Sequence, residues 1–175
     1  LGVMFPFTST VELARQAADA CRYPPAGRRG SGAGLATFRW PAPEGYCDFA
    51  DRNVLVVAII EEVEAVERIN EIAAVPGVDV LFVGPSDLAF SLGLRGDKSH
   101  PKVEQAMTRV AEAARQNGKV PGRVATTAED VRRATDQGFL FLQAGSELSL
   151  MAAGARELFG ALGRSGTAGD GPNAY

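Results

Sequence analysis

Two acidic residues stand just beyond two successive apolar runs of the chain. Glu61 follows the run 54–60, and Asp87 follows the run 78–83 after a Gly-Pro turn. The β-branched and large apolar residues of these runs are typical of buried strands. A helix-length segment separates the two strands, which favours parallel pairing. Because ligands and catalytic groups collect at the carboxyl ends of parallel strands, we expect Glu61 and Asp87 to face one cavity.

Two carboxylates that face one cavity repel each other unless a cation lies between them. A site with few protein ligands, all of them oxygens, suits Mg²⁺ or Mn²⁺, with water or substrate filling the other positions. A purely structural interpretation is also open. Glu61 belongs to an acidic helix start, where negative side chains complement the helix dipole. Asp87 could serve only as a helix N-cap.

The elements that must position these residues alternate along the chain. Apolar runs predict strands, and helical spacing with start and stop signals predicts the helices between them. The strands are expected at 2–7, 54–60, 78–83, 120–125 and 139–143. The helices are expected at 9–21, capped by Ser9, then at 62–73, 101–117, 126–137 and 147–162. The segment 23–51 begins as a loop rich in proline and glycine and is ambiguous beyond that.

This alternation predicts a parallel sheet and the α/β class. A (β/α)8 barrel needs eight units and typically about 250 residues. On pattern alone, five units in 175 residues therefore favour an open doubly wound sheet. We expect one domain over 1–163 and a flexible tail over 164–175, where glycine and small polar residues dominate.

Composition is that of an ordinary soluble globular domain, with 46% hydrophobic and 22% charged residues. The net charge of −3 provides no basic surface for nucleic acid or for an anionic membrane. No apolar run is long enough to span a bilayer, and no signal peptide opens the chain. Cys21 and Cys47 lack metal-type spacing and suit reduced thiols, so we expect a cytoplasmic protein.

Several motifs resemble those of one protein family in order and spacing. They are RYPPAGRRG at 22–30, IE at 60–61, VPGVD at 75–79, FVGPSDL at 82–88, GDKSHP at 96–101, GK at 118–119 and QAGSEL at 143–148. The likeness covers about residues 2–162. The chain thus resembles the metal-dependent pyruvate aldolases of the HpcH/HpaI type, such as 2-dehydro-3-deoxyglucarate aldolase and 4-hydroxy-2-oxoheptanedioate aldolase.

The resemblance implies a (β/α)8 TIM barrel of the phosphoenolpyruvate/pyruvate type, of which this chain carries about strands 4–8. It implies reversible cleavage of 2-keto-4-hydroxy acids to pyruvate and a small aldehyde, through a metal-stabilised enolate. The family usually assembles as a homo-oligomer, a hexamer. By position, Glu61 and Asp87 resemble the ligands of the divalent metal, which is Mg²⁺ or Mn²⁺, with Co²⁺ as another candidate. Ser86 and Asp87 resemble the residues whose backbone N–H groups bind the pyruvate carboxylate.

The lysines favour a metal mechanism without reference to the family. A Schiff-base aldolase needs a desolvated lysine at the active face. Lys98 lies in a polar loop, Lys102 opens a predicted helix, and Lys119 precedes a predicted strand. A lysine before a strand lies at the opposite rim of the sheet from Glu61 and Asp87.

The chain departs from the family pattern in two respects. The family's general-base histidine, its aspartate partner and an enolate-binding arginine lie upstream of Leu1, so no catalytic residue is identified in this chain. Ile59 stands where the family usually has glutamine, which removes a polar contact to substrate. We therefore expect little aldolase activity from these 175 residues alone. Exposed strand edges should also make the isolated chain poorly soluble or dependent on partner chains.

Other candidate residues are less informative. His100, the only histidine, precedes a proline at a helix entry and is expected to be structural rather than a replacement base. Arg28 and Arg29 suit either anion binding or a loop contact, and Arg123 and Glu147 have no assigned role. A noncatalytic barrel remnant and a relative of citrate lyase remain as alternatives to the aldolase.

Overall fold

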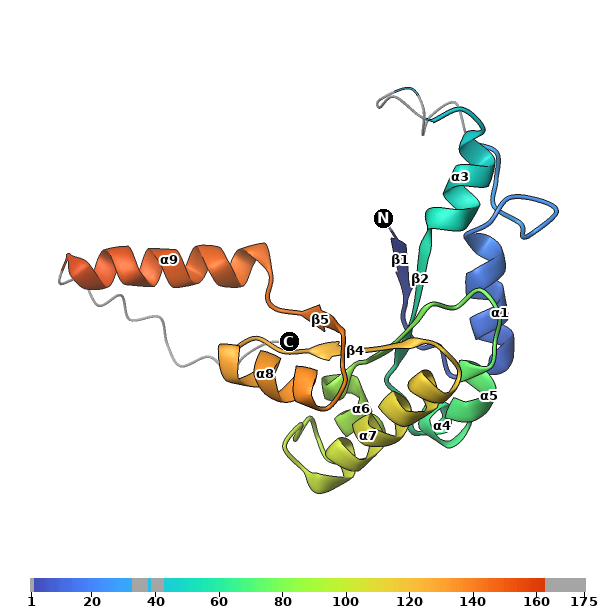
Figure 1. Cartoon of the computed structure of the whole chain (residues 1–175). Coiled ribbons are helices and arrows are strands. Elements are labelled where there is room, and N and C mark those ends of the chain that lie inside the picture. Colours follow the sequence, from blue (N-terminus) through green and yellow to red (C-terminus); the bar gives the residue numbers. More distant parts are fainter. Residues whose placement is uncertain (1, 33–37, 39–42, 163–175) are drawn as a thin grey trace.

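Five parallel strands form one sheet in the computed structural model, which describes residues 2–32, 38 and 43–162 (Figure 1). The strands are β1 (Gly2–Phe5), β2 (Leu55–Ile60), β3 (Val80–Val83), β4 (Val120–Val124) and β5 (Phe141–Gln143). Each expected strand is present, although all five are shorter than the ranges predicted for them. The tail expected over 164–175 lies outside the described residues.

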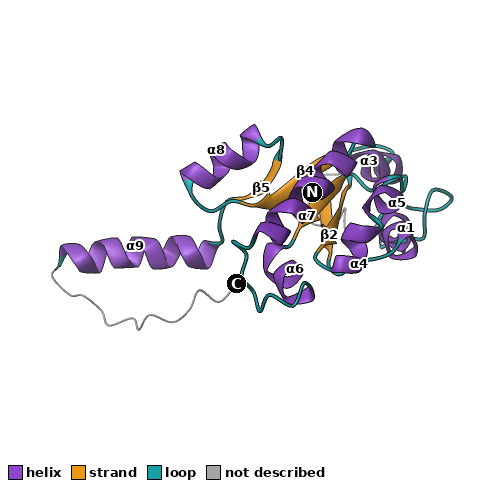
Figure 2. Cartoon of the chain, turned by 90° about the horizontal axis from the view of Figure 1, so that it is seen from below, coloured by secondary structure: helices purple, strands orange, loops and turns teal. Residues whose placement is uncertain are grey.

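Helices connect the strands and flank the sheet. They are α1 (Val11–Ala20), α3 (Tyr46–Asn53), α4 (Val63–Glu67), α5 (Ile69–Ala73), α6 (Pro85–Ser91), α7 (Pro101–Gln116), α8 (Ala128–Asp136) and α9 (Glu147–Ala161). Helices α1, α5 and α7 pack side by side along the sheet, with α1 against β2 and α7 against β3 and β4 (Figure 2).

The order of the strands distinguishes a barrel wall from a doubly wound sheet. In a doubly wound sheet the strand order reverses at a switch point, and helices cover both faces. Here each strand pairs in parallel with its neighbour in sequence, from β1 through β5. The open doubly wound sheet favoured by pattern alone is therefore wrong. The expected partial (β/α)8 barrel is confirmed.

The main core lies between the sheet and its helices. Alternate residues of β2 point into it, namely Val56, Ala58 and Ile60. Helix α5 contributes Ile69 and Ile72, both fully buried. On α7 the apolar positions predicted from helical spacing are all buried, and they are Val103, Met107, Val110 and Ala114. Burial of this face, rather than local propensity, holds the helices against the strands.

A second, smaller cluster occupies the opposite face of the sheet. It consists of Val57, Val80 and Phe82, with Ile59 and Phe141 packed against it. The rings of Phe82 and Phe141 meet edge to face, with centroids 6.1 Å apart. In a closed barrel this face is the interior, so these side chains form the floor beneath the carboxyl ends of the strands.

Two helix boundaries differ from the sequence predictions. The N-cap of α1 is Thr10, whose hydroxyl accepts a hydrogen bond from the Leu13 N–H at 3.2 Å. Ser9, the expected cap, instead donates to the Glu62 carboxylate. The helix predicted at 62–73 is broken into α4 and α5 at Arg68, where the backbone leaves the α region. The contact between Ser9 and Glu62 is tertiary, so a local pattern does not contain it.

Thr127 caps α8, and its removal provides a stability prediction. Its hydroxyl accepts a hydrogen bond from the Asp130 N–H at 3.0 Å. We expect Thr127→Ala to lower the free energy of unfolding by about 1 kcal/mol, as loss of an N-cap does elsewhere. Urea denaturation measures the change, with Thr126→Ala as the matched control. Equal losses in the two variants would show that the cap contributes nothing.

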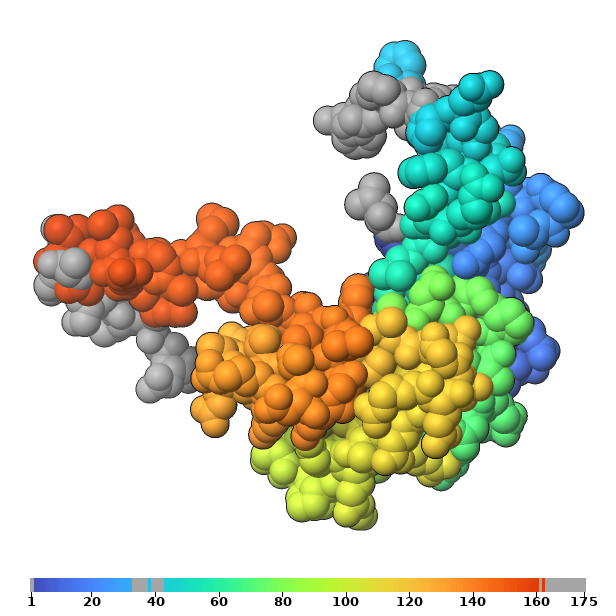
Figure 3. Space-filling view, in the orientation of Figure 1, coloured from blue at the N-terminus to red at the C-terminus, as the bar shows by residue number. Residues whose placement is uncertain are grey.

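Helix α9 extends away from the rest of the chain (Figures 1 and 3). Its side chains from 147 to 160 are all exposed. They include several large apolar ones, namely Leu148, Leu150, Met151, Leu158 and Phe159. Although α9 is apolar, no helix in the described ranges has both the length and the hydropathy to cross a membrane. An exposed apolar surface of this kind is typical of a protein–protein interface.

Candidate active site

Glu61 lies buried at the carboxyl end of β2, with only 6% of its surface exposed. Its Oε1 accepts a hydrogen bond from the backbone N–H of Phe7 at 2.7 Å. Burial raises the pKa of the Glu61 carboxyl. The Phe7 hydrogen bond opposes this rise in pKa, whereas the charges of Asp87 and Glu62 add to it. Glu61 is thus a buried acid near other negative charges, an arrangement that a cation would stabilise.

Asp87 lies in the first turn of α6, and its exposed side chain does not cap the helix. The N-cap is Gly84, Pro85 follows it, and no side chain makes a capping hydrogen bond. The interpretation of Asp87 as an N-cap is therefore wrong. Its charge acts on Glu61, so the fold brings these two residues to the same edge of the sheet, as their positions predict. Ser86 lies beside Asp87 and is half-buried.

Gly84 leaves the space that the Glu61 carboxylate occupies. A Cβ atom at this position would lie 2.7 Å from Glu61 Oε2 and 3.0 Å from Glu61 Cβ. Both contacts are shorter than real Cβ atoms tolerate without a shift of the neighbour. The Gly84 N–H donates to the Ile60 carbonyl at 3.1 Å, which holds the turn against β2. The absence of a side chain here lets the carboxylate lie over the start of α6.

Substitution of Gly84 tests this packing. We expect Gly84→Ala to displace the Glu61 carboxylate and to lower the free energy of unfolding by about 1–3 kcal/mol, the usual cost of overpacking. Gly30→Ala is the matched control, because a Cβ there meets nothing within 4 Å. Denaturant titration of both variants measures the difference. A Gly84→Ala chain as stable as Gly30→Ala would contradict the close approach.

The loop between β1 and α1 reaches the carboxylates through groups that sequence reasoning missed. Phe7 has a φ of 50°, in the left-handed region that is uncommon for residues other than glycine. This conformation accompanies the hydrogen bond from its N–H to Glu61. The neighbouring Ser9 hydroxyl donates to Glu62. No side-chain motif marks Phe7, because its contribution comes from its backbone.

Ile59 belongs to the barrel-interior face and packs with Val57 and Phe82. Its Cγ2 lies 3.4 Å from the place that a Cβ on Gly84 would take, so it borders the same turn as Glu61. The apolar floor therefore reaches the edge of the candidate site. That Ile59 removes a polar contact to substrate stays a prediction.

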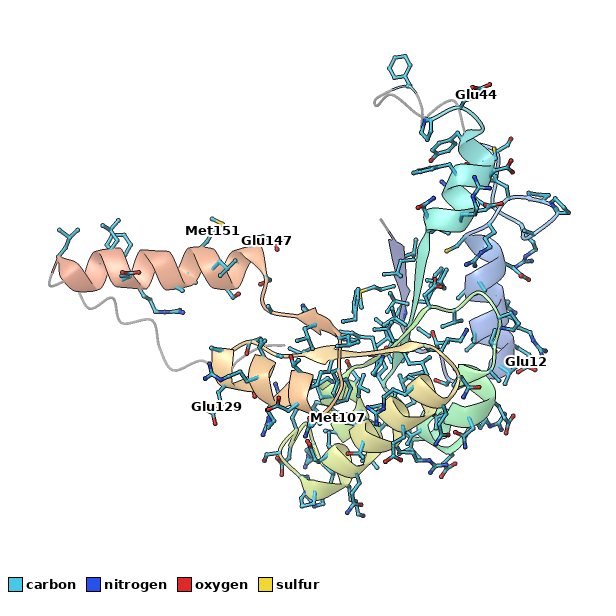
Figure 4. All side chains as sticks on the ribbon, viewed as in Figure 1. Glu12, Glu44, Met107, Glu129, Glu147 and Met151 are labelled. Carbon is cyan, nitrogen blue, oxygen red and sulfur yellow. The ribbon has the colours of Figure 1, made fainter. Side chains whose placement is uncertain are left out.

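The other polar candidates have structural contacts or lie elsewhere. The His100 Nδ1 accepts a hydrogen bond from the Lys102 N–H at 3.2 Å and caps α7, in agreement with a structural role. The Arg29 guanidinium lies 4.6 Å from the centroid of the Tyr23 ring, a contact within one loop. Glu147 opens α9, away from the other strand ends (Figure 4).

A metal centre built wholly from protein side chains is not present in the part of the chain that the structure describes. Within it, no three His, Cys, Asp or Glu side chains come together in a group that could hold a metal ion. Magnesium usually takes only one or two carboxylates from the protein and completes its shell with water or substrate. The pair Glu61 and Asp87 matches that more open kind of site.

Comparison with known proteins agrees with the geometry. The family model described as HpcH/HpaI aldolase/citrate lyase matches residues 1–153. A hydroxypyruvate/pyruvate aldolase of Delftia acidovorans is 40% identical over 85% of this chain and 56% of its own length. A 4-hydroxy-2-oxo-heptane-1,7-dioate aldolase of Escherichia coli is 35% identical over 95% of this chain and 64% of its own length. The chain therefore spans about three fifths of the length of the curated relatives it matches.

Solved structures share the fold. An HpcH/HpaI aldolase/citrate lyase family protein of Burkholderia cenocepacia superposes with a TM-score of 0.84 and 33% identity, over 93% of this chain and 65% of its own. An HpcH/HpaI aldolase of Desulfitobacterium hafniense superposes with a TM-score of 0.80 and 32% identity, over 94% of this chain and 65% of its own. The five-stranded sheet thus corresponds to part of a larger fold in both proteins.

Proposed function

Because this chain belongs to the HpcH/HpaI aldolase/citrate lyase family, we propose that it is part of a divalent-metal-dependent aldolase. The proposed reaction is the reversible cleavage of a 2-keto-4-hydroxy acid into pyruvate and a small aldehyde. The observation that carries the proposal is the buried Glu61 beside Asp87 at the carboxyl edge of β2 and β3. The names of the relatives, which are pyruvate and keto-acid aldolases, support it.

The residues at this edge fit a divalent cation. Their donor atoms are carboxylate oxygens, which Mg²⁺ and Mn²⁺ prefer, and Co²⁺ also accepts such ligands. Glu61 is buried near two further negative charges, which disfavour its ionised form in the absence of a counter-charge. We propose Glu61 and Asp87 as the ligands. When bound, the cation supplies Lewis-acid stabilisation of the negative charge that develops on a substrate oxygen.

Backbone contacts orient the first of these ligands. The Phe7 N–H engages Oε1 of Glu61, and among the described residues no donor engages Oε2. One oxygen is thus anchored, and the other is free to bind. The Ser9 hydroxyl meanwhile engages Glu62, so this third carboxylate is held by a separate hydrogen bond. Anchoring lowers the entropy that Glu61 would lose on binding a cation.

The start of α6 supplies donors for an anion. The first N–H of this helix that bonds back is that of Leu88, which donates to the Gly84 carbonyl at 3.0 Å. The N–H groups of Ser86 and Asp87 precede it and have no acceptor within the helix. We propose that they bind the pyruvate carboxylate. In this proposal Asp87 contributes twice, through its backbone N–H to the substrate and through its side chain to the cation.

The proton-transfer groups of such an aldolase are not identified among these residues. His100 caps α7 with its imidazole, and Glu61 is assigned to the cation. We propose that the chain provides the binding half of the site, and that residues outside this sequence provide the general base. A noncatalytic remnant of the barrel would have the same binding residues but no general base.

We further propose that the protein is a homo-oligomer, a hexamer by family resemblance. The exposed apolar side chains of α9, among them Leu148, Met151 and Phe159, support this. Light scattering coupled to size exclusion measures the mass in solution. A monodisperse monomer would contradict the proposal.

Two measurements on the 175-residue chain separate the possible functions. Manganese binding is followed by electron paramagnetic resonance, and exchange of the pyruvate methyl protons with deuterium is followed by NMR. We expect manganese to bind and the pyruvate protons to exchange slowly or not at all. This result would support the proposal that the chain provides the binding half of the site. Fast exchange would show that the chain holds its own base, and absence of metal binding would reject the metal assignment. Cleavage of a citrate-type substrate by a longer form would instead favour the lyase alternative.

A further inference from the structure

Arg123 occupies a position in β4 where a charged side chain is unexpected. The strand alternates, with Gly122 and Val124 on the barrel-interior face and Arg123 on the face toward the helices. Helix-facing residues of the neighbouring strand, such as Leu81 and Val83, are apolar and fully buried. Arg123 is itself only 7% exposed. A buried guanidinium is costly unless negative charge or good hydrogen-bond acceptors compensate it.

The hydrogen bonds of Arg123 leave much of its guanidinium unused. Its Nε donates to the Val124 carbonyl at 3.2 Å, and its Nη1 donates to Gln137 Oε1 at 3.1 Å. The guanidinium also lies 5.5 Å from the centroid of the Phe139 ring. These contacts are to neutral groups. A guanidinium carries five N–H donors, and Nη2 and the second N–H of Nη1 have no acceptor among the described residues. No buried side-chain nitrogen of these residues lacks a hydrogen bond, so Nη2 is open to solvent.

Glu104 and Asp130, the two acids whose charges act on Arg123, are bound to other donors. Glu104 Oε1 accepts a hydrogen bond from Gln137 Nε2 at 2.8 Å, and Asp130 pairs with Arg133 at 3.0 Å. Among the residues that the structure describes, no carboxylate oxygen lies within ion-pair distance of the Arg123 guanidinium. The buried charge therefore lacks a counter-ion in this part of the protein.

Arg123 lines an open cavity of about 1110 Å³ between α7 and α8. Lys98, Ser99 and Thr126 line it as well and bring an ammonium and two hydroxyl groups. Two further guanidinium groups, of Arg109 and Arg133, face it, as do the carboxylates of Glu104, Glu112 and Asp130. Neither Glu61 nor Asp87 lines this cavity.

Both helices that border the cavity begin at it. Pro101, the first residue of α7, and Asp130, in the first turn of α8, are lining residues. The N-terminus of a helix carries partial positive charge, which favours anions. The cavity thus combines a buried guanidinium, an ammonium and two helix N-termini.

We propose that this cavity binds a small oxyanion. The oxygens of its phosphate or carboxylate group accept hydrogen bonds from the free N–H groups of Arg123. The planar guanidinium suits such a group because its donors match a pair of oxygens in one plane. The bound anion would form the direct ion pair that no described carboxylate makes with Arg123. Lys98 and Thr126 provide the second charge and a hydroxyl donor. Pro85, which begins α6, also lines the cavity, so the ligand lies next to the helix that carries Ser86 and Asp87.

The test uses the purified 175-residue chain and two probes, inorganic phosphate and succinate, at constant ionic strength with chloride as the reference. Binding is measured by calorimetry and by chemical shifts of backbone amides. We expect saturable binding of at least one probe. Arg123→Met keeps the apolar stem of the side chain and should weaken binding about tenfold or more, as loss of a charge-assisted hydrogen bond does.

Control variants make the result specific. Arg132→Gln removes an exposed positive charge from α8 outside the cavity and should leave binding unchanged. Lys98→Met, at an exposed position, should also weaken binding and serves if Arg123→Met does not fold. Binding of phosphate alone or of succinate alone identifies the favoured oxyanion and supports the proposal. The proposal is overturned if neither probe binds more strongly than chloride. It is also overturned if Arg132→Gln loses as much affinity as Arg123→Met or Lys98→Met.

Discussion

Replacement of Glu61 by glutamine is expected to abolish divalent-metal binding and, at neutral pH, to stabilise the metal-free chain. Glutamine has nearly the same shape, and its oxygen can still accept the Phe7 N–H, but it carries no negative charge. Loss of a group that hydrogen-bonds to a metal ligand lowers metal affinity by about 10- to 100-fold. Loss of the charge on the ligand itself should lower the affinity further. Calorimetric titration with Mn²⁺ measures this effect.

The stability effect follows from the direction of the pKa change. The pKa of Glu61 is raised in the folded state, so protonation of this carboxyl stabilises the fold. This stabilisation is fully present at low pH, below the pKa that Glu61 has in the unfolded chain. It is lost as the pH rises through the folded-state pKa. The neutral Glu61→Gln variant does not undergo this loss. Its stability should match that of the parent chain at low pH and exceed it at neutral pH.

The measurement is thermal unfolding in chelator at several pH values. Glu12→Gln is the matched control, since Glu12 lies exposed in the first turn of α1 (Figure 4) and its charge is not among those that raise the pKa of Glu61. That variant should keep the parent chain's metal affinity and should change stability by less than about 0.5 kcal/mol. A Glu61→Gln chain that still bound Mn²⁺ with parental affinity would remove Glu61 from the ligand set.

Leu81→Ala is expected to have the largest effect on stability. Leu81 is fully buried at the centre of β3, between β2 and β4, and faces the helix-side core. Truncation of such a leucine removes its transfer free energy and leaves a cavity, which together cost about 2–5 kcal/mol. A domain of ordinary stability has about 5–15 kcal/mol in total, so the variant should be close to unfolding at elevated temperature.

Denaturant titration compares Leu81→Ala with Leu140→Ala, a leucine that is 71% exposed before β5. The second variant should change the free energy of unfolding by less than about 0.5 kcal/mol. Similar losses in both would mean that β3 is not the buried centre of the sheet.

Local pattern predicts most of the secondary structure of this chain. The apolar runs 54–60 and 78–83 become β2 and β3, because continuous apolar residues need burial on both faces of a sheet. Helix α7 follows from its apolar spacing and from Pro101 at its first position. Even the shared edge of Glu61 and Asp87 is predictable, since it requires only that the two strands be parallel neighbours.

Two helix boundaries differ from the local signals, and one of them involves a distant group. Ser9 has the sequence neighbours of an N-cap, yet it donates to Glu62 from the next strand–helix unit, and Thr10 caps α1 instead. The break at Arg68 likewise has no glycine or proline to mark it. At Ser9 a contact between elements outweighs a local capping preference of about 1 kcal/mol.

The amino-acid sequence by itself determined the strands, most helices and the edge at which Glu61 and Asp87 meet, because side-chain periodicity and strand direction are local properties. Only the tertiary structure decided the pairing of the strands in sequential order and the anchoring of Glu61 by the Phe7 backbone. It also decided the burial of Arg123 without an ion pair to any described residue. These features depend on which faces and backbone groups meet across the fold. The backbone donor of Phe7 is the same as that of every residue but proline, so its residue type does not reveal that its N–H points at Glu61.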